Sequence, residues 1–212
     1  MPCDKKTARI DKIWLFGGPT ASWGGSMEKD SLIKGCRYFG IPNALYVYGP
    51  ANHEMLDTLK DLKRVVCHAG GACRNPGASA GLVEDAVQIN RLSFEYPNIR
   101  GAISDDFLDE LNMYQDKKRC KKKPEDLQTM YASLKQGRPD LSYYAVIYAH
   151  ELYLDLDIAG YLPLIDVPVF WLWKQSEIRD IGRHVAKCAA VFKNKPILQG
   201  IFMFDYGEKN EA

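Results

Sequence analysis

Acidic side chains follow several short apolar runs of this sequence, at the points where the runs end. Asp105 and Asp106 follow IRGAIS, Glu151 follows YYAVIYAH, and Asp205 follows FMF. A carboxyl group is costly in apolar surroundings unless it is paired or reaches solvent, so these positions indicate exposed strand ends or a functional cleft. Carboxyl groups that face one cleft can donate or accept a proton or act as nucleophiles. The candidate catalytic pair is one of Asp105 and Asp106 together with Glu151 or Asp205.

The adjacent aspartates Asp105 and Asp106 are not expected to have the same role. Successive side chains of a strand point to opposite faces, so regular geometry directs at most one of the two into the cleft. The other has a structural role open to it, as the N-cap of the helical turn that begins at FLDE. The alternation does not decide which aspartate faces the cleft.

Further polar and aromatic side chains at the same strand ends are candidates for substrate contact. His150 could serve as a general acid, a hydrogen-bonding group or a metal ligand, or begin a solvated helix. Trp171 and Trp173 alternate onto one face, where a ring could stack on a sugar, although most strand aromatics are core residues. The candidate substrate-binding residues are His150, Trp171, Trp173, Tyr48 and Glu177.

The elements that must position these residues alternate regularly along the chain. Seven apolar runs, each typical of a buried parallel strand, are separated by stretches that mostly have helical periodicity. This pattern predicts a (β/α) barrel, in which the chemistry collects at the carboxyl ends of the strands. The runs are KIWLFGG (12–18), ALYVYGP (44–50), RVVCHAG (64–70), IRGAISDDF (99–107), YYAVIYAHE (143–151), VPVFWLWKQ (167–175) and LQGIFMFDYG (198–207).

Local signals support helices between the runs. Asn52 is a plausible N-cap, Gly40 a stop signal, and Pro124 a first helical residue followed by acidic residues. The competing architecture is a doubly wound open sheet, which usually carries a phosphate loop or a glycine fingerprint after an early strand. The glycine-rich stretch 16–25 has neither spacing, so it is interpreted as a βα loop.

No further strand-helix unit is recognisable after the seventh run. A complete eight-unit barrel typically needs about 250 residues. We therefore expect one α/β domain over residues 1–212, a TIM-type (β/α)8 barrel that either lacks its C-terminal unit or contains one strand that the sequence does not reveal.

Composition excludes several classes of partner. The net charge of +1 gives no long-range field that would favour nucleic acid, and the basic segment 117–123 is interpreted as a solvated loop or helix face. No run approaches the roughly 20 apolar residues of a membrane span. The six cysteines are scattered, which favours a reducing interior, and Cys67 and Cys188 are expected to be core thiols. No cofactor is predicted. Oligomeric state and compartment stay open, with the cytoplasm favoured.

The stretch YPNIRGAISDDF, with AHEL after the next strand and MFDYG after a later one, resembles uncharacterised bacterial glycosidase-like barrel proteins, whose fourth strand ends in a similar Asp-Asp-Phe. The resemblance covers most of the chain, from KIWLFGG to FMFDYG. It implies a barrel of the glycoside hydrolase type with carboxylates at the strand ends. A carbohydrate is the substrate class that it suggests.

Two other classes of function remain open. The first is a metal-dependent barrel hydrolase or isomerase, which needs at least three ligands to converge. Its candidate ligands are His68, Asp105, Asp106, His150, Glu151 and Asp205. The second is a non-catalytic carbohydrate-binding barrel, in which aromatic residues bind sugar and no two carboxylates have a catalytic spacing. The paired-His motif that many metallohydrolase barrels have after the first strand is missing, which counts against the metal-dependent class. The glycosidase interpretation predicts no metal site.

Overall fold

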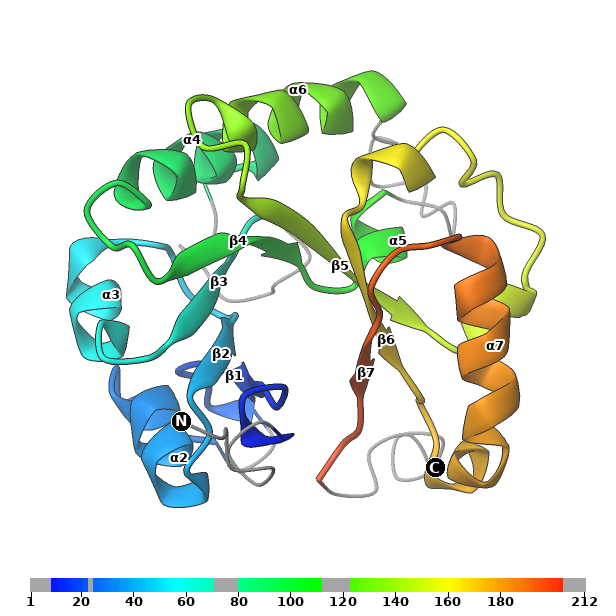
Figure 1. Ribbon diagram of the computed structural model, residues 1–212, viewed down its shortest axis with the longest axis horizontal. Helices are drawn as coiled ribbons and strands as arrows, with labels where there is room; N and C mark the ends of the chain where they lie inside the picture. Colours follow the sequence, from blue (N-terminus) through cyan, green and yellow to red (C-terminus); the bar gives the residue numbers. More distant parts are fainter. Residues whose placement is uncertain (1–8, 23–24, 71–79, 112–122, 204–212) are drawn as a thin grey trace, which may run out of the picture.

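The structure, a computed structural model, describes residues 9–22, 25–70, 80–111 and 123–203. Within these ranges seven strands form one parallel sheet, whose spatial order follows the order of the chain. The sheet curls into an arc with helices on its outer side, so the fold is a half-barrel (Figure 1). Each predicted run overlaps one of the strands, and β2 and β5 begin one residue earlier than predicted. The strands are β1 (Leu15–Gly17), β2 (Asn43–Tyr46), β3 (Arg64–His68), β4 (Ile99–Ser104), β5 (Ser142–Tyr148), β6 (Val167–Trp171) and β7 (Leu198–Gly200).

Several helix ends follow the predicted local signals. The Asn52 side chain caps α3 by accepting a hydrogen bond from the Met55 amide at 2.9 Å. Gly40 ends α2 with a left-handed φ of 66°, which glycine adopts without strain. Pro124 begins α6. The α-helices are α2 (Ser31–Phe39), α3 (His53–Leu59), α4 (Leu82–Leu92), α5 (Phe107–Glu110), α6 (Pro124–Lys135) and α7 (Ile181–Val191), and the 3₁₀ helices are η2 (His150–Tyr153), η3 (Leu162–Leu164) and η4 (Gln175–Asp180).

The sheet separates two apolar cores. The larger, outer core fills the space between the strands and the helices, and it contains Cys67 and Cys188 as the buried free thiols that were predicted. The inner core fills the concave side with strand residues such as Val66, Val146 and Val169. A curled sheet whose interior is packed with branched side chains is the arrangement that a barrel requires.

Side chains from the two ends of the sheet meet on the concave side. Phe16 of β1 packs edge-on against Trp171 of β6, with ring centroids 5.1 Å apart. Trp14, just before β1, lies 6.3 Å from Tyr144 of β5 between ring centroids. In the described part of the chain β1 pairs only with β2, and β7 only with β6. The curled parallel sheet is thus confirmed, whereas closure into a complete eight-unit barrel is not shown.

An irregularity in β4 sets the direction of its last side chains. Arg100 is an extra residue, because consecutive residues of β3 pair with Ile99 and Gly101. Gly101 has a φ of 155°, and any side chain there would collide with the backbone of β5. The bulge shifts the alternation by one position, so Ile99 and Ala102 both lie in the outer core and Ile103 lies in the inner core.

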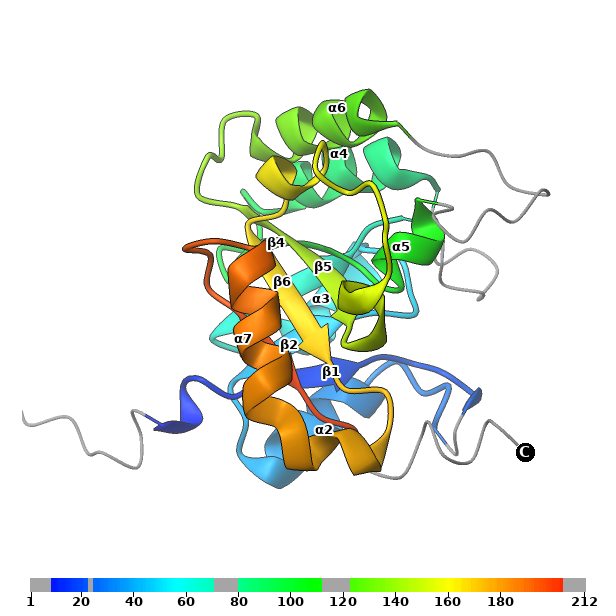
Figure 2. The same cartoon turned by 90° about the vertical axis from the view of Figure 1, so that its right-hand side faces the viewer.

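Two of the stretches between the strands are less helical than the periodicity of the sequence indicates. The segment DLDIAGYLPLI (155–165), before β6, forms only the short η3. After β6, η4 winds with about three residues per turn, so Ile178 does not continue the buried face of α7 and is 48% exposed. Helix α7 then lies on the outer side of the strands (Figure 2). No helix in the described ranges has the length and apolar character to cross a membrane.

Candidate active site

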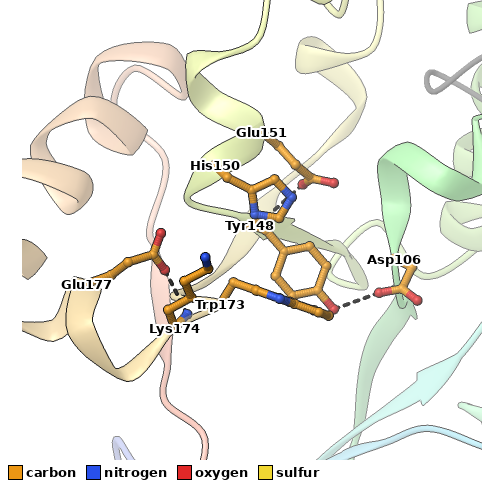
Figure 3. Close-up of a pocket in the computed structure, with 7 residues that line it drawn as sticks. All are labelled: Asp106, Tyr148, His150, Glu151, Trp173, Lys174 and Glu177. Atoms are coloured by element: carbon orange, nitrogen blue, oxygen red, sulfur yellow. Dashed lines mark hydrogen bonds between the residues drawn. The ribbon is translucent and has the colours of Figure 1, made fainter. Parts of the chain in front are cut away.

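A cavity of about 550 Å³ lies beyond the carboxyl ends of β4, β5 and β6 (Figure 3). Its size is within the range of small-molecule sites, and barrel enzymes place their chemistry at this end of the strands. The cavity brings together five residues that the sequence singled out, namely Asp106, His150, Glu151, Trp173 and Glu177. Tyr148 and Lys174 complete the lining.

Tyr148, the last residue of β5, contacts both carboxylates of the candidate pair. Its phenol donates a hydrogen bond to Asp106 Oδ1 at 2.6 Å, and its backbone amide donates to Glu151 Oε2 at 2.7 Å. Burial raises the pKa of the phenol, and the negative charges of Asp105, Asp106 and Glu151 raise it further. The Tyr148 hydroxyl therefore remains a hydrogen-bond donor at neutral pH.

Tyr148 is not among the predicted site residues, although the sequence contains a signal for it. Tyr144 and Val146 lie in the inner core, and Tyr148 follows them at the same two-residue spacing. An aromatic residue in this phase at the end of a strand must reach the open end of the curl. The alternation within β5 could have identified it.

Asp106 reaches the cavity through an unusual backbone conformation. Its φ of 47° and ψ of 51° lie in the left-handed region, which is uncommon outside glycine but which aspartate tolerates better than most residues. Asp106 occupies the N-cap position of α5, yet its side chain makes no capping hydrogen bond there. The Asp106 side chain therefore does not take the capping role that was open to one of the two aspartates, and its carboxylate accepts from Tyr148 instead.

Asp105 is buried and is not among the residues that line the cavity. It follows Ile103 in the inward phase of β4, is 9% exposed, and accepts a hydrogen bond from the Asp106 amide at 3.1 Å. Burial raises the pKa of the Asp105 carboxyl well above its usual range, and the adjacent Asp106 charge raises it further. Of the two aspartates only Asp106 lines the cavity, in agreement with the expectation that at most one would do so.

Glu151 enters the cavity from η2, the turn that directly follows β5. Ala149 continues the pairing with β6 through its amide, which donates to the Trp171 carbonyl at 2.8 Å, and the chain then winds into η2. The Glu151 side chain points back to the strand end, where the Tyr148 amide holds it. Although Glu151 is 5% exposed, it lies at the cavity wall.

Aromatic rings form a wall beside the carboxylates. The Tyr148 ring stacks on the imidazole of His150, with centroids 5.8 Å apart, and meets the indole of Trp173 edge-on at 5.0 Å. Desolvation lowers the pKa of His150; nearby Glu177 opposes this shift and Lys174 adds to it. His150 is therefore mainly neutral at pH 7, where its ring has one donor and one acceptor nitrogen.

The remaining side of the cavity comes from the start of η4. Glu177 accepts a hydrogen bond from the Lys174 amide at 2.9 Å, which fixes the first turn of η4. Both side chains line the cavity beyond Trp173. The site thus combines a cation, three carboxylates and an aromatic wall, a set of groups that can bind a polar ligand with apolar faces.

Trp171 and Tyr48, two of the predicted substrate-binding residues, are not among the residues that line this cavity. Trp171 is 8% exposed and lies in the inner core, where it packs on Phe16 and Phe202. Tyr48 packs against the same core, edge-on to Phe16. Trp171, the last residue of β6, is therefore a core residue, whereas Tyr48 follows β2 and is half-buried against the same core. Asp205 lies outside the described residues.

The described ranges contain no group of three His, Cys, Asp or Glu side chains placed to hold a metal ion. The described residues therefore give no support to the metal-dependent alternative. Whether Asp205 could contribute a metal ligand is not tested, because it lies outside the described residues.

Comparison with known proteins supports the fold. No protein-family model matches the sequence, and no curated protein matches it significantly. The structure is similar to that of a β-D-glucuronidase from Dictyoglomus thermophilum, with a TM-score of 0.51 and 14% sequence identity. The match covers 87% of this chain and 35% of that protein, so the chain spans about a third of its structural neighbour. At this identity the similarity shows the fold alone.

Proposed function

We propose that this chain forms a glycoside hydrolase-like site that acts on a carbohydrate through Asp106 and Glu151. The observation that carries the proposal is the convergence of the two carboxylates, from the ends of β4 and β5, in one cavity with an aromatic wall. A glycosidase needs two carboxyl groups on opposite sides of the scissile bond. It also needs a surface for the apolar face of a sugar ring, which Trp173 can provide.

In the proposed reaction one carboxyl group protonates the glycosidic oxygen as the bond to the sugar breaks. The other either attacks the anomeric carbon, at a separation of about 5–5.5 Å, or activates water, at about 6.5–9.5 Å. Tyr148 lies between the carboxylates, with its amide on Glu151 and its hydroxyl on Asp106. His150 and Glu177 are placed to bind sugar hydroxyls, and no cofactor has a role in this chemistry.

We also propose that the half-barrel is part of a TIM-type (β/α)8 barrel. The curl of the sheet, the packed inner core and the cavity at the carboxyl ends of the strands support this architecture. An eighth strand would pair with the edges of β1 and β7. An experimental structure of the protein in which both edges face solvent would contradict this proposal.

The test of the proposed activity is the release of phenol from a panel of aryl glycosides. The panel includes the β-D-glucuronide, because the structural neighbour is named a β-D-glucuronidase. We expect wild-type turnover of at least one substrate, and a loss of about 10²–10⁴-fold in Asp106→Asn and Glu151→Gln. The matched control is Asp155→Asn, which removes an exposed carboxylate between β5 and β6 and should leave turnover unchanged.

Other outcomes identify the alternative functions. If the wild type binds a sugar in calorimetry but cleaves none of the panel, a carbohydrate-binding barrel replaces the enzyme. If a chelator abolishes turnover and a divalent ion restores it, the metal-dependent class is correct. Wild-type turnover in both Asp106→Asn and Glu151→Gln would place the chemistry outside this cavity.

A further inference from the structure

Tyr148 connects the two carboxylates through two different donors. Its side-chain hydroxyl donates to Asp106 and its backbone amide donates to Glu151. A bond from a hydroxyl to a carboxylate stabilises the ionised form of the acid. The 2.6 Å distance between the Tyr148 oxygen and Asp106 Oδ1 is in the range of such charge-assisted bonds.

The rings around Tyr148 fix the position of its hydroxyl. His150 stacks on one face, at an interplanar angle of 14°, and Trp173 meets the ring edge-on. These contacts and the inner core restrict the ring, so its hydroxyl cannot easily move to another hydrogen-bond partner. The Asp106 carboxylate, which starts from a strained left-handed residue, is therefore directed by a rigid donor.

The two carboxylates differ in their surroundings. Glu151 is 5% exposed, whereas Asp106 is half-buried and accepts the phenol bond. Each carboxylate accepts one hydrogen bond from Tyr148, so burial is what distinguishes the two. In a glycosidase the more desolvated carboxyl group is suited to hold a proton, and the better solvated one stays ionised. This difference assigns separate roles to two groups that share one cavity.

We propose that Tyr148 is a positioning residue that keeps Asp106 ionised, as the base or nucleophile, and leaves proton donation to Glu151. The assignment rests on the proposed function for its chemical meaning, but the interaction between Tyr148 and Asp106 can be tested without turnover. The charged and titratable groups around Asp106 in the described chain are Asp105 on its own element, Tyr148, His150 and Glu151 from β5 and η2, and Lys174 and Glu177 after β6.

The decisive substitution is Tyr148→Phe, which removes the hydroxyl bond to Asp106 and keeps the backbone amide bond to Glu151. The matched control is Tyr143→Phe on the same strand. The Tyr143 hydroxyl donates to Ser104 Oγ at 2.7 Å on the outer side of the sheet, so this control also loses one buried phenol bond. Thermal melting of both variants shows whether either loss has disturbed the fold.

The first readout is independent of activity. The side-chain carboxyl of Asp106 is titrated by NMR in protein labelled with ¹³C-aspartate, and its signal is assigned by its absence in Asp106→Asn. We expect the Asp106 pKa to rise in Tyr148→Phe, because the ionised form loses a donor, and to stay unchanged in Tyr143→Phe. An unchanged Asp106 titration in a folded Tyr148→Phe protein would overturn the proposal.

The second readout applies to any glycoside that the wild type cleaves. We expect Tyr148→Phe to lower kcat about tenfold or more with little change in KM, and to move the acidic limb of the kcat/KM profile to higher pH. Tyr143→Phe should preserve the wild-type profile. An unmoved acidic limb in Tyr148→Phe overturns the role assignment. An inactive wild type with a shifted Asp106 titration instead contradicts the proposed function and leaves the positioning contact established.

Discussion

At the amino-terminal end of the sheet Asn43 and Arg64 form a hydrogen bond with each other. At the carboxyl end two neighbouring carboxyl groups, Asp105 and Asp106, disfavour each other's ionised form. Asn43, fully buried at the start of β2, donates to the Asp11 and Ile13 carbonyls and accepts from the Arg64 guanidinium at 2.8 Å. Stacking of the same guanidinium over the Trp14 ring, 4.8 Å from the centroid, completes this amino-terminal network. In this network hydrogen-bond donors are paired with acceptors, which stabilises the fold.

The carboxyl-terminal end has the opposite character. Burial and the charge of Asp106 raise the pKa of Asp105, and Asp106 adopts a left-handed conformation. Glu151 is buried beside them at the cavity wall. Unfavourable electrostatics and backbone strain gather at functional sites because they preorganise reactive groups. The comparison predicts that substitutions at the amino-terminal end change stability and that those at the carboxyl end change activity.

The largest expected effect separates activity from stability at the carboxyl end. Asp106→Asn and Glu151→Gln should lose about 10²–10⁴-fold in turnover while their melting temperatures stay close to that of the wild type. Each amide keeps an oxygen that can accept the existing bond from Tyr148. Turnover and differential scanning calorimetry measure the two quantities. Loss of activity accompanied by global unfolding would remove the distinction between the two ends.

Asn43→Ala tests the amino-terminal end. The substitution removes the acceptor of Arg64 Nε and the side-chain donor to the Asp11 and Ile13 carbonyls, while the contact of Arg64 with the Asp11 carbonyl remains. We expect the free energy of unfolding to fall by roughly 2–3 kcal/mol. Urea denaturation measures this change, and kcat of the folded protein should remain that of the wild type. A loss of kcat without destabilisation would show that the two ends are coupled.

Asp105→Asn should change the pH dependence of stability. A carboxyl pKa that is raised in the folded state means that the unfolded chain loses its proton first, so wild-type stability falls as pH rises. The fall begins near the unfolded aspartate pKa, at about 4, and ends at the raised folded pKa. Each unit of that shift corresponds to about 1.4 kcal/mol.

The melting temperature of Asp105→Asn relative to the wild type should therefore increase between pH 4 and neutral pH. Asp155→Asn, at an exposed position, is the control and should follow the wild-type curve. Parallel curves for the wild type and Asp105→Asn would show that Asp105 is ionised in the folded protein.

The smallest expected effect compares two tryptophans. Trp173 forms part of the cavity wall, while Trp14 packs on Arg64 at the opposite end of the sheet. Trp173→Phe should raise KM several-fold, because the smaller ring offers less surface to a sugar. Trp14→Phe should leave KM unchanged. Equal KM values for both variants and the wild type would remove Trp173 from the substrate-binding residues.

By itself the sequence determined the elements and the end of the sheet at which polar residues gather. Continuous apolar runs and local signals such as Asn52 and Gly40 act over a few residues, so the strands and most helices followed from periodicity alone. The placement of His150 and Glu151 at the end of a strand followed in the same way. These features depend on spacing along the chain, which a sequence records directly.

Only the tertiary structure decided which aspartate enters the cavity and what holds it. Without the Arg100 bulge, alternation from Ile99 would have reversed the faces at the end of β4. With the bulge, the inward position goes to Asp105, and Asp106 reaches the cavity because its left-handed backbone redirects the side chain toward Tyr148. Bulges, positive φ angles and contacts between β4 and β5 arise from how strands pack on one another, so no local pattern in the sequence contains them.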